Sequence, residues 1–298
     1  MIHVAIVSYF SVGAYDTNTL DENQMLSDML SELQVSHEIV SWSDPEVKWE
    51  QFSLLLIKST WDYFDYYSDF LAWINKIKKL GIPTLNSMET ILWNSSKRYL
   101  LEIESKGFPV IAGMILERGV PVSKEKIDSK INANTWVIKP LVSGGAKNTL
   151  KISDENWNDQ VEKIQSWVNE EAFLVQPFVT EVERVGEYSL LFFNGKYSHA
   201  VLKTPASKDF RVQHYFGGTI KSVSPSAAML SSCQKLIDKF ASESLYARVD
   251  GVEIAGTFHL MELEMIEPYL FLGLSGQALS NYKQAIKERL EKFNQSEN

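Results

Sequence analysis

A chain of 298 residues with 45% hydrophobic and 22% charged residues has the composition of an ordinary globular protein, long enough for two or three lobes with substantial cores. Its formal charge is −9, and its Lys and Arg residues are scattered, which argues against nucleic-acid and anionic-membrane binding. Cys233 is the only cysteine, so an intrachain disulfide and a thiolate metal cluster within one chain are both excluded.

The first apolar run has no basic region before it, and no later apolar stretch reaches the roughly 18 residues that a membrane span needs. We therefore expect neither a signal peptide nor a membrane helix, and we predict a cytoplasmic protein. A periplasmic protein without disulfides is the alternative.

Residues 1–90 are predicted to form an open α/β domain. The run at 2–7 is apolar on both alternations, as in a strand buried on both faces of a parallel sheet. Apolar residues at helical spacing alternate with further strand-like runs, which gives helices at 22–33 and 68–80 and strands at 37–40, 52–57 and 81–85.

The strand at 52–57 runs into Trp61, Asp62 and Tyr63. Ligands of open α/β sheets bind outside the carboxyl ends of the strands, so this segment is a candidate substrate site. Asp62 would pair with a substrate ammonium. The alternative, in which the two aromatic residues pack between domains and Asp62 caps a turn, stays open.

The sequence pattern changes after Asn86, and we place the domain boundary at residue 90. A helix around 97–101 then ends near Gly107 and Pro109. Strands are expected beyond it at 135–139, 173–179, 188–193, 198–203, 246–252 and 258–263, and helices at 154–169, 224–244 and 277–293.

Lys139 stands at a strand end and is followed by a loop of small residues, Ser143, Gly144, Gly145 and Ala146. Backbone N–H groups of such a loop can approach an anion closely, and the lysine adds a point charge, so the loop is predicted to cover phosphates. It lacks the Gly-Lys-Ser/Thr arrangement of a Walker loop. A tight hairpin with a solvent-reaching lysine is the alternative.

Two later strands carry charges at alternate positions. Arg248 and Asp250 share one face of the first strand, and Glu262 and Glu264 share one face of the second. If the strands pair antiparallel, the carboxylates converge, and oxygen ligands on rigid strands suit Mg²⁺. Solvent-facing sides of amphipathic strands are the alternative.

Two weaker patterns lie between these motifs. A strand-terminal segment, Gln176, Pro177, Phe178 and Val179, could hold an adenine edge, and Glu187 nearby could accept from ribose hydroxyls. Arg211 precedes a flexible Gly217-Gly218 loop and suits phosphate or carboxylate recognition. A plain strand connection and a surface arginine are the respective alternatives.

The order of these motifs, from Lys97 to Glu262-x-Glu264, resembles the ATP-grasp superfamily over residues 90–275. The family commonly ends this motif with Glu-x-Asn, so Glu264 departs from the pattern. Residues 59–63, 198–203 and 262–268 resemble the branch that contains O-ureidoserine cyclo-ligase, with glutathione synthetase and ribosomal-protein glutamate ligase as more distant relatives.

The resemblance implies a mixed α/β and α+β fold, with the open α/β domain at 1–90 followed by a two-lobed ATP-grasp domain at 91–298. The smaller lobe would span 91–172 and carry the phosphate lid, and the larger would span 173–298 and carry the metal site. ATP would be the cosubstrate, with one or two Mg²⁺ ions, or Mn²⁺ in their place.

The resemblance also implies roles for individual residues. Lys97 and Lys139 would bind phosphates, residues 143–148 would close over them, and residues 176–179 and Glu187 would hold the nucleoside. Catalytic roles would go to Arg211, Arg248 and Lys203, metal binding to Asp250, Glu262 and Glu264, and substrate binding to Trp61, Asp62, Tyr63, Gly217 and Gly218.

The expected function is ATP- and Mg²⁺-dependent ligation. A carboxylate of a small amino-acid-like substrate would be activated as an acyl phosphate and attacked by a nitrogen nucleophile, in the same molecule or in another. A small-molecule kinase on the same fold and a non-catalytic nucleotide-binding regulatory module are the alternatives. The sequence identifies neither substrate, and it leaves a homodimer and a monomer equally open.

Overall fold

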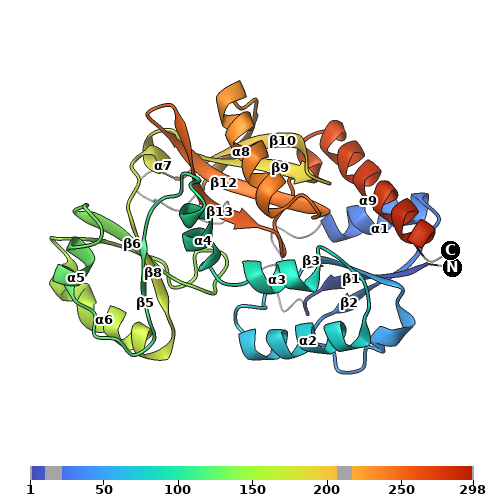
Figure 1. Ribbon diagram of the computed structural model, residues 1–298, viewed down its shortest axis with the longest axis horizontal. Coiled ribbons are helices and arrows are strands. Elements are labelled where there is room, and N and C mark those ends of the chain that lie inside the picture. Colours follow the sequence, from blue (N-terminus) through green and yellow to red (C-terminus); the bar gives the residue numbers. More distant parts are fainter. Residues whose placement is uncertain (1, 11–21, 207–216, 297–298) are drawn as a thin grey trace.

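The computed structural model describes residues 2–10, 22–206 and 217–296. Their strands form three sheets (Figure 1). The architecture is mixed α/β, as predicted. Within these described ranges, no helix is long and apolar enough to cross a membrane.

The first sheet is parallel, with the strand order β2-β1-β3-β4. Its inner strands are buried along almost their whole length, because helices and the neighbouring sheet cover them. The expected β-α-β order is confirmed here, with boundaries shifted by a few residues. The elements are β1 (His3–Ser8), α1 (Glu22–Glu32), β2 (Ser36–Ser41), β3 (Leu54–Ser59), α2 (Tyr67–Leu80), β4 (Thr84–Leu85) and α3 (Met88–Asn94).

The second sheet is antiparallel, with the order β11-β10-β9-β12-β13. The β12–β13 hairpin turns through Ala255 and Gly256, whose φ angles of 49° and 80° match a two-residue hairpin turn. The elements are β9 (Glu187–Phe193), β10 (Lys196–Thr204), β11 (Thr219–Val223), α8 (Ala227–Phe240), β12 (Tyr246–Ile254), β13 (Thr257–Glu264) and α9 (Gly276–Ser296).

The third sheet is antiparallel, with the order β5-β8-β6-β7, and lies at the far end of the molecule from both termini (Figure 1). It packs on α5 and α6 through an apolar core of its own. In chain order, the elements from residue 99 to 184 are α4 (Tyr99–Ser105), β5 (Met114–Leu116), α5 (Lys124–Asp128), β6 (Thr135–Pro140), β7 (Leu150–Ser153), α6 (Trp157–Glu170), β8 (Phe173–Pro177) and α7 (Glu181–Arg184). Of these, α4 and α7 pack against the second sheet.

The first and second sheets share one hydrophobic core. Leu54 and Leu56 of β3 belong to the same buried cluster as Leu191 of β9 and Tyr246 of β12. Burying apolar surface in common stabilises the two sheets against each other. The relative position of these two sheets is therefore well fixed. The division of the chain at residue 90 stays a prediction.

Candidate functional site

A cavity of about 1070 Å³ lies where the three sheets meet. Its volume suits a ligand of nucleotide size, since small-molecule sites span about 300–1,000 Å³. Strands of the second and third sheets supply part of its lining. The rest comes from segments outside these strands, among them those that follow β3, β6 and β13. The predicted site residues that line it are Trp61, Tyr63, Lys97, Lys139, Ser143, Gly144, Gly145, Ala146, Gln176, Pro177, Phe178, Val179, Glu187, Lys203, Gly218, Arg248, Asp250, Glu262 and Glu264.

Three predicted site residues do not line this cavity or cannot be placed. Asp62 is not among the lining residues, and its carboxylate accepts a hydrogen bond from the Trp42 indole at 2.6 Å. Gly217 adjoins the lining without belonging to it, and Arg211 lies outside the described residues. The roles of all three stay predictions.

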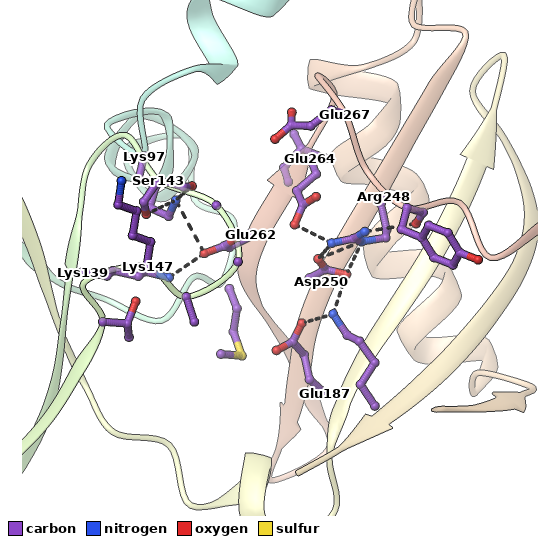
Figure 2. A pocket seen from close by; sticks show the side chains of 18 of the residues that line it. Lys97, Lys139, Ser143, Lys147, Glu187, Arg248, Asp250, Glu262, Glu264 and Glu267 are labelled. Atoms are coloured by element: carbon purple, nitrogen blue, oxygen red, sulfur yellow. Dashed lines mark hydrogen bonds and ion pairs between the residues drawn. The ribbon is translucent and has the colours of Figure 1, made fainter. Parts of the chain in front are cut away.

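Two lysines meet one carboxylate on the side of the cavity nearest the third sheet (Figure 2). Lys139 Nζ donates to Glu262 Oε1 at 2.8 Å, and Lys97 Nζ lies 4.0 Å from the same oxygen. Lys97 also donates to the Ser143 carbonyl at 2.9 Å. Both lysines are buried, so their charges are poorly screened. Two ammonium groups against one carboxylate leave a positive balance that suits an anionic ligand.

The pKa values of these groups reflect the same balance. Burial, assisted by the nearby Lys139 ammonium, lowers the pKa of Lys97. Burial alone would raise the pKa of Glu262, but Lys139 and Lys97 outweigh it and bring that pKa to about 2. Glu262 is therefore ionised throughout the neutral range.

A second charged cluster lies on β12 and β13. The pairing register places Arg248 opposite Glu264 and Asp250 opposite Glu262, so the predicted antiparallel pairing is confirmed. The Arg248 guanidinium donates to Asp250 at 2.8 Å and to Glu264 at 2.5 Å (Figure 2). Arg248 thus stands between two of the three predicted metal ligands.

Lys203 extends this cluster toward β9. Its ammonium donates to Glu187 at 2.5 Å and lies 3.6 Å from Asp250. Burial would raise the pKa of Asp250, but Arg248 and Lys203 outweigh it and hold that pKa below its ordinary value. Burial raises the pKa of Glu187. The wall is therefore an ordered network of alternating charges.

Carboxyl groups lie close to one another near the end of β13. Burial, followed by the negative charges of Asp250 and Glu262, raises the pKa of Glu264 to about 7. Burial and the adjacent Glu264 raise the pKa of Glu267 to about 8. Carboxylates are thus more numerous here than the cations can fully compensate.

The donor chemistry of Asp250, Glu262 and Glu264 fits a hard divalent cation, since all three offer carboxylate oxygens to one cavity. Across the described ranges, however, no three acidic, histidine or cysteine side chains are already arranged around one point. The physical reason is that each carboxylate is drawn to a cation: Asp250 and Glu264 to Arg248, and Glu262 to Lys139. Their metal role stays a prediction.

The nucleoside-binding candidates lie together at the end of β8. The Gln176 side chain donates to the Ile111 carbonyl at 2.5 Å, and the Phe178 N–H donates to the Thr135 carbonyl at 2.8 Å. The Lys151 ammonium lies 3.5 Å from the centre of the Phe178 ring. This wall is apolar and its backbone is held in place, which suits a flat aromatic ligand.

The loop at 143–148 faces the segment after β3. The side chain of Lys147 forms an ion pair with Asp65, and a Cβ on Gly144 would lie 2.5 Å from the Phe64 ring. A larger residue at position 144 would therefore require the Phe64 ring or the loop to shift. The loop bridges the third sheet and the first domain, and its proposed motion as a lid stays a prediction.

Several lining residues were not predicted from the sequence, among them Asn94, Tyr99, Glu267, Tyr269 and Phe271. Glu267 lies in the motif at 262–268, which resembles the cyclo-ligase branch, but the sequence predicts no role for Glu267 itself. The sequence signal that could have identified Glu267 is its position directly before Pro268, just past the end of β13.

Comparison with known proteins places these observations in a family. Residues 111–275 match the family described as prokaryotic glutathione synthetase, ATP-grasp domain, and residues 4–86 match the N-terminal domain of the D-cycloserine synthetase DcsG. The cycloserine biosynthesis protein DcsG of Streptomyces lavendulae is 26% identical over 274 residues, covering 86% of this chain and 90% of that protein.

Solved structures agree on the fold. The crystal structure of D-cycloserine synthetase DcsG superposes with a TM-score of 0.85 at 22% identity, covering 97% of this chain and 99% of that one. A D-alanine–D-alanine ligase from Bacillus anthracis, complexed with ATP, superposes with a TM-score of 0.74 at 14% identity, covering 99% of this chain and 98% of that one.

Proposed function

This chain belongs to the ATP-grasp family and is an ATP-dependent ligase that forms carbon–nitrogen bonds, and from that premise we propose that it acts on a small amino-acid-like substrate. The substrate carboxylate would be activated as an acyl phosphate and then attacked by a nitrogen nucleophile. The observation that carries the proposal is the single cavity in which two buried lysines face a network of arginine and carboxylates.

In the first step a carboxylate oxygen attacks the γ-phosphorus of ATP. The bond from that phosphorus to the β,γ-bridging oxygen breaks, so the products are an acyl phosphate and ADP. Lys97 and Lys139 would offset the negative charge of the phosphates, and the loop at 143–148 would cover them. Gln176, Phe178 and Val179 would hold the adenine, and Glu187 the ribose.

Asp250, Glu262 and Glu264 would hold Mg²⁺, which would neutralise charge on the transferring phosphoryl group. The low pKa values of Asp250 and Glu262 keep both carboxylates ionised at neutral pH, as oxygen ligands of a cation must be. Glu264, with a pKa of about 7, is the member of the set whose charge depends on its neighbours.

In the second step the nitrogen attacks the acyl carbon, phosphate leaves with the bonding electron pair, and the nitrogen loses a proton. The net change is an amide-type bond at the cost of one ATP converted to ADP and phosphate. Arg248, which is buried beside Asp250, and Arg211 would stabilise the negative charge of the acyl phosphate and its tetrahedral adduct.

The finer proposal is that the nitrogen belongs to the same molecule as the carboxylate, so that the product is a ring. It is supported by the match of residues 4–86 to the N-terminal domain of a D-cycloserine synthetase and by the relative of that name. The fold alone does not identify the substrate, because the residues that determine specificity differ freely among proteins of one fold.

The test is a screen for substrate-dependent ADP release with amino acids, small peptides and O-ureidoserine, each followed by mass spectrometry. A ligase yields a product that has lost the elements of water, and a cyclo-ligase does so from a single organic substrate. Added hydroxylamine would trap the acyl phosphate as a hydroxamate. A stable phosphoester with no ligated product would overturn the proposal in favour of a kinase.

A further inference from the structure

The segment from Met265 to Leu270, which follows β13, has no regular secondary structure, yet each of its six carbonyl oxygens accepts a hydrogen bond from a side chain. The donors, in chain order of the carbonyls, are Asn86 (2.8 Å), Tyr246 (2.7 Å), Trp61 (2.8 Å), Lys58 (3.1 Å), Arg248 (3.0 Å) and His199 (2.9 Å). We call these residues the 265–270 segment.

The donors come from two different parts of the fold. Lys58 lies on β3 of the first sheet, and Trp61 and Asn86 follow β3 and β4. The other three donors lie on β10 and β12 of the second sheet. Lys58 and Asn86 are each 1% exposed, so their polar groups depend on these bonds. Ordering an irregular backbone is entropically costly, and the donors fix it in one conformation.

The 265–270 segment presents one charged side chain, Glu267, to the cavity (Figure 2). Every other charged residue that lines the cavity has an ion-pair partner, whereas Glu267 has none among the described residues. Glu264 is its nearest acidic neighbour, and Arg248 is already shared between Glu264 and Asp250. A partly buried carboxylate without an ion pair would be stabilised by a cationic partner.

The charges of the surrounding wall indicate the sign of that partner. Two cations, Arg248 and Lys203, face four carboxylates, those of Glu187, Asp250, Glu264 and Glu267. Lys97 also lies near Glu267, but it is bound to Ser143 and faces Glu262. A cation at this end of the cavity would complete the pairing by favouring the ionised form of Glu267.

Aromatic side chains also line the cavity, and one of them contacts the backbone of Glu267. Trp61 and Tyr63 line the cavity, and the Trp61 indole donates to the carbonyl of Glu267 itself. An aromatic surface next to a carboxylate favours a small cation such as a primary ammonium over a metal ion. Asp62, the residue predicted for this role, is bound to Trp42 and does not line the cavity.

We propose that Glu267 binds the ammonium group of the substrate, so that the enzyme selects substrates with a free amine in addition to the carboxylate that is activated. This inference rests on the proposed function for the identity of the second group. It assigns two neighbouring parts of the cavity to opposite charges: phosphates beside Lys97 and Lys139, and the amine beside Glu267 and Trp61.

Calorimetry with Mg²⁺ and AMP-PNP present tests the proposal without requiring turnover. The probes are O-ureidoserine, serine and alanine in both enantiomers, together with two compounds that lack a basic amine, N-acetylserine and glycerate. We expect the wild type to bind at least one amine probe, and Glu267→Gln to bind it about 10- to 100-fold more weakly, the range of a charge-assisted hydrogen bond. AMP-PNP affinity should be unchanged.

The matched control is Glu253→Gln, the same change at an exposed position of β12 outside the cavity. If Glu267→Gln folds poorly, Glu267→Asp and Trp61→Phe replace it, since the first shortens the carboxylate and the second removes its backbone anchor. Both should weaken amine binding.

Three outcomes would overturn the proposal: equal affinity of wild type and Glu267→Gln, equal binding of serine and glycerate by the wild type, or no binding of any amine probe. Failure of the ligase function looks different. In that case amine binding would still depend on Glu267, and no ligated product would form.

Discussion

Lys139 and Glu262 are 123 residues apart in the chain, yet the lysine ammonium lies 2.8 Å from a carboxylate oxygen of the glutamate. Lys139 belongs to β6 of the third sheet, and Glu262 to β13 of the second. The pair therefore spans the cavity from one sheet to the other (Figure 2). It links the group proposed to bind phosphate to the group proposed to bind the metal ion.

Replacing Glu262 with Gln should reduce kcat by about 100-fold or more, the loss expected when a preorganised charge-stabilising group is removed. The side chain keeps its size, but its negative charge between Lys97 and Lys139 is lost. Steady-state ADP release with the identified substrate gives the measurement, and Glu253→Gln is the control. A folded Glu262→Gln enzyme with near-normal kcat would remove this residue from the site.

The same pair predicts how stability depends on pH. The folded-state pKa of Glu262 is about 2, below its ordinary value of 4.5. Its ionised form therefore stabilises the folded chain fully at pH values above the ordinary pKa. That contribution should be lost as pH falls from about 5 to 2. Urea unfolding across this window should show the wild type losing about 1–3 kcal/mol more than Glu262→Gln. Parallel pH profiles would contradict the assignment.

A second ion pair, far more buried, is predicted to be structural. Lys58 and Glu22 are 1% and 2% exposed, and their charged groups lie 2.7 Å apart. Lys58→Met leaves the Glu22 carboxylate without its cation, so the free energy of unfolding should fall by about 3–5 kcal/mol. Denaturant unfolding measures this loss. The exposed pair of Lys78 and Glu89 offers a control, Lys78→Met, which should cost less than about 1 kcal/mol.

The loop at 143–148 is predicted to act as a lid. Its amide hydrogens should exchange with solvent more slowly when AMP-PNP and Mg²⁺ are bound, and equal exchange in both states would indicate a static hairpin. Gly144→Ala forces a Cβ toward the Phe64 ring, and we expect it to raise the KM for ATP about tenfold through the cost of overpacking. Gly276→Ala, where no atom lies within 4 Å, is the matched control.

The pattern of alternating charges was readable from the sequence because it is local. Arg248 and Asp250 are two residues apart, as are Glu262 and Glu264, and a strand of period two must place each pair on one face. The hydrophobic runs of β1 and β3 likewise predicted a parallel sheet. The short edge strands β5, β7 and β11 were not predicted, since three to five residues carry too little periodicity.

The ion pairs and the contacts of the 265–270 segment could not be predicted from the sequence, for a different reason. Glu22 opens a helix and would be expected to face solvent, yet Lys58, from a strand 36 residues later, buries it. The carbonyls of the 265–270 segment bind side chains that lie up to 210 residues away. No local pattern encodes such partners, and the unpaired state of Glu267 becomes visible only once they are placed.

Carboxylate activation is the central claim, and labelled oxygen tests it most directly. The identified substrate would be prepared with ¹⁸O in its carboxylate, incubated with ATP, Mg²⁺ and the enzyme, and the released inorganic phosphate analysed by mass spectrometry. An acyl phosphate must pass one carboxylate oxygen to phosphate, so the account predicts phosphate that carries one ¹⁸O atom. Unlabelled phosphate from a reaction that consumes ATP and forms product would contradict it.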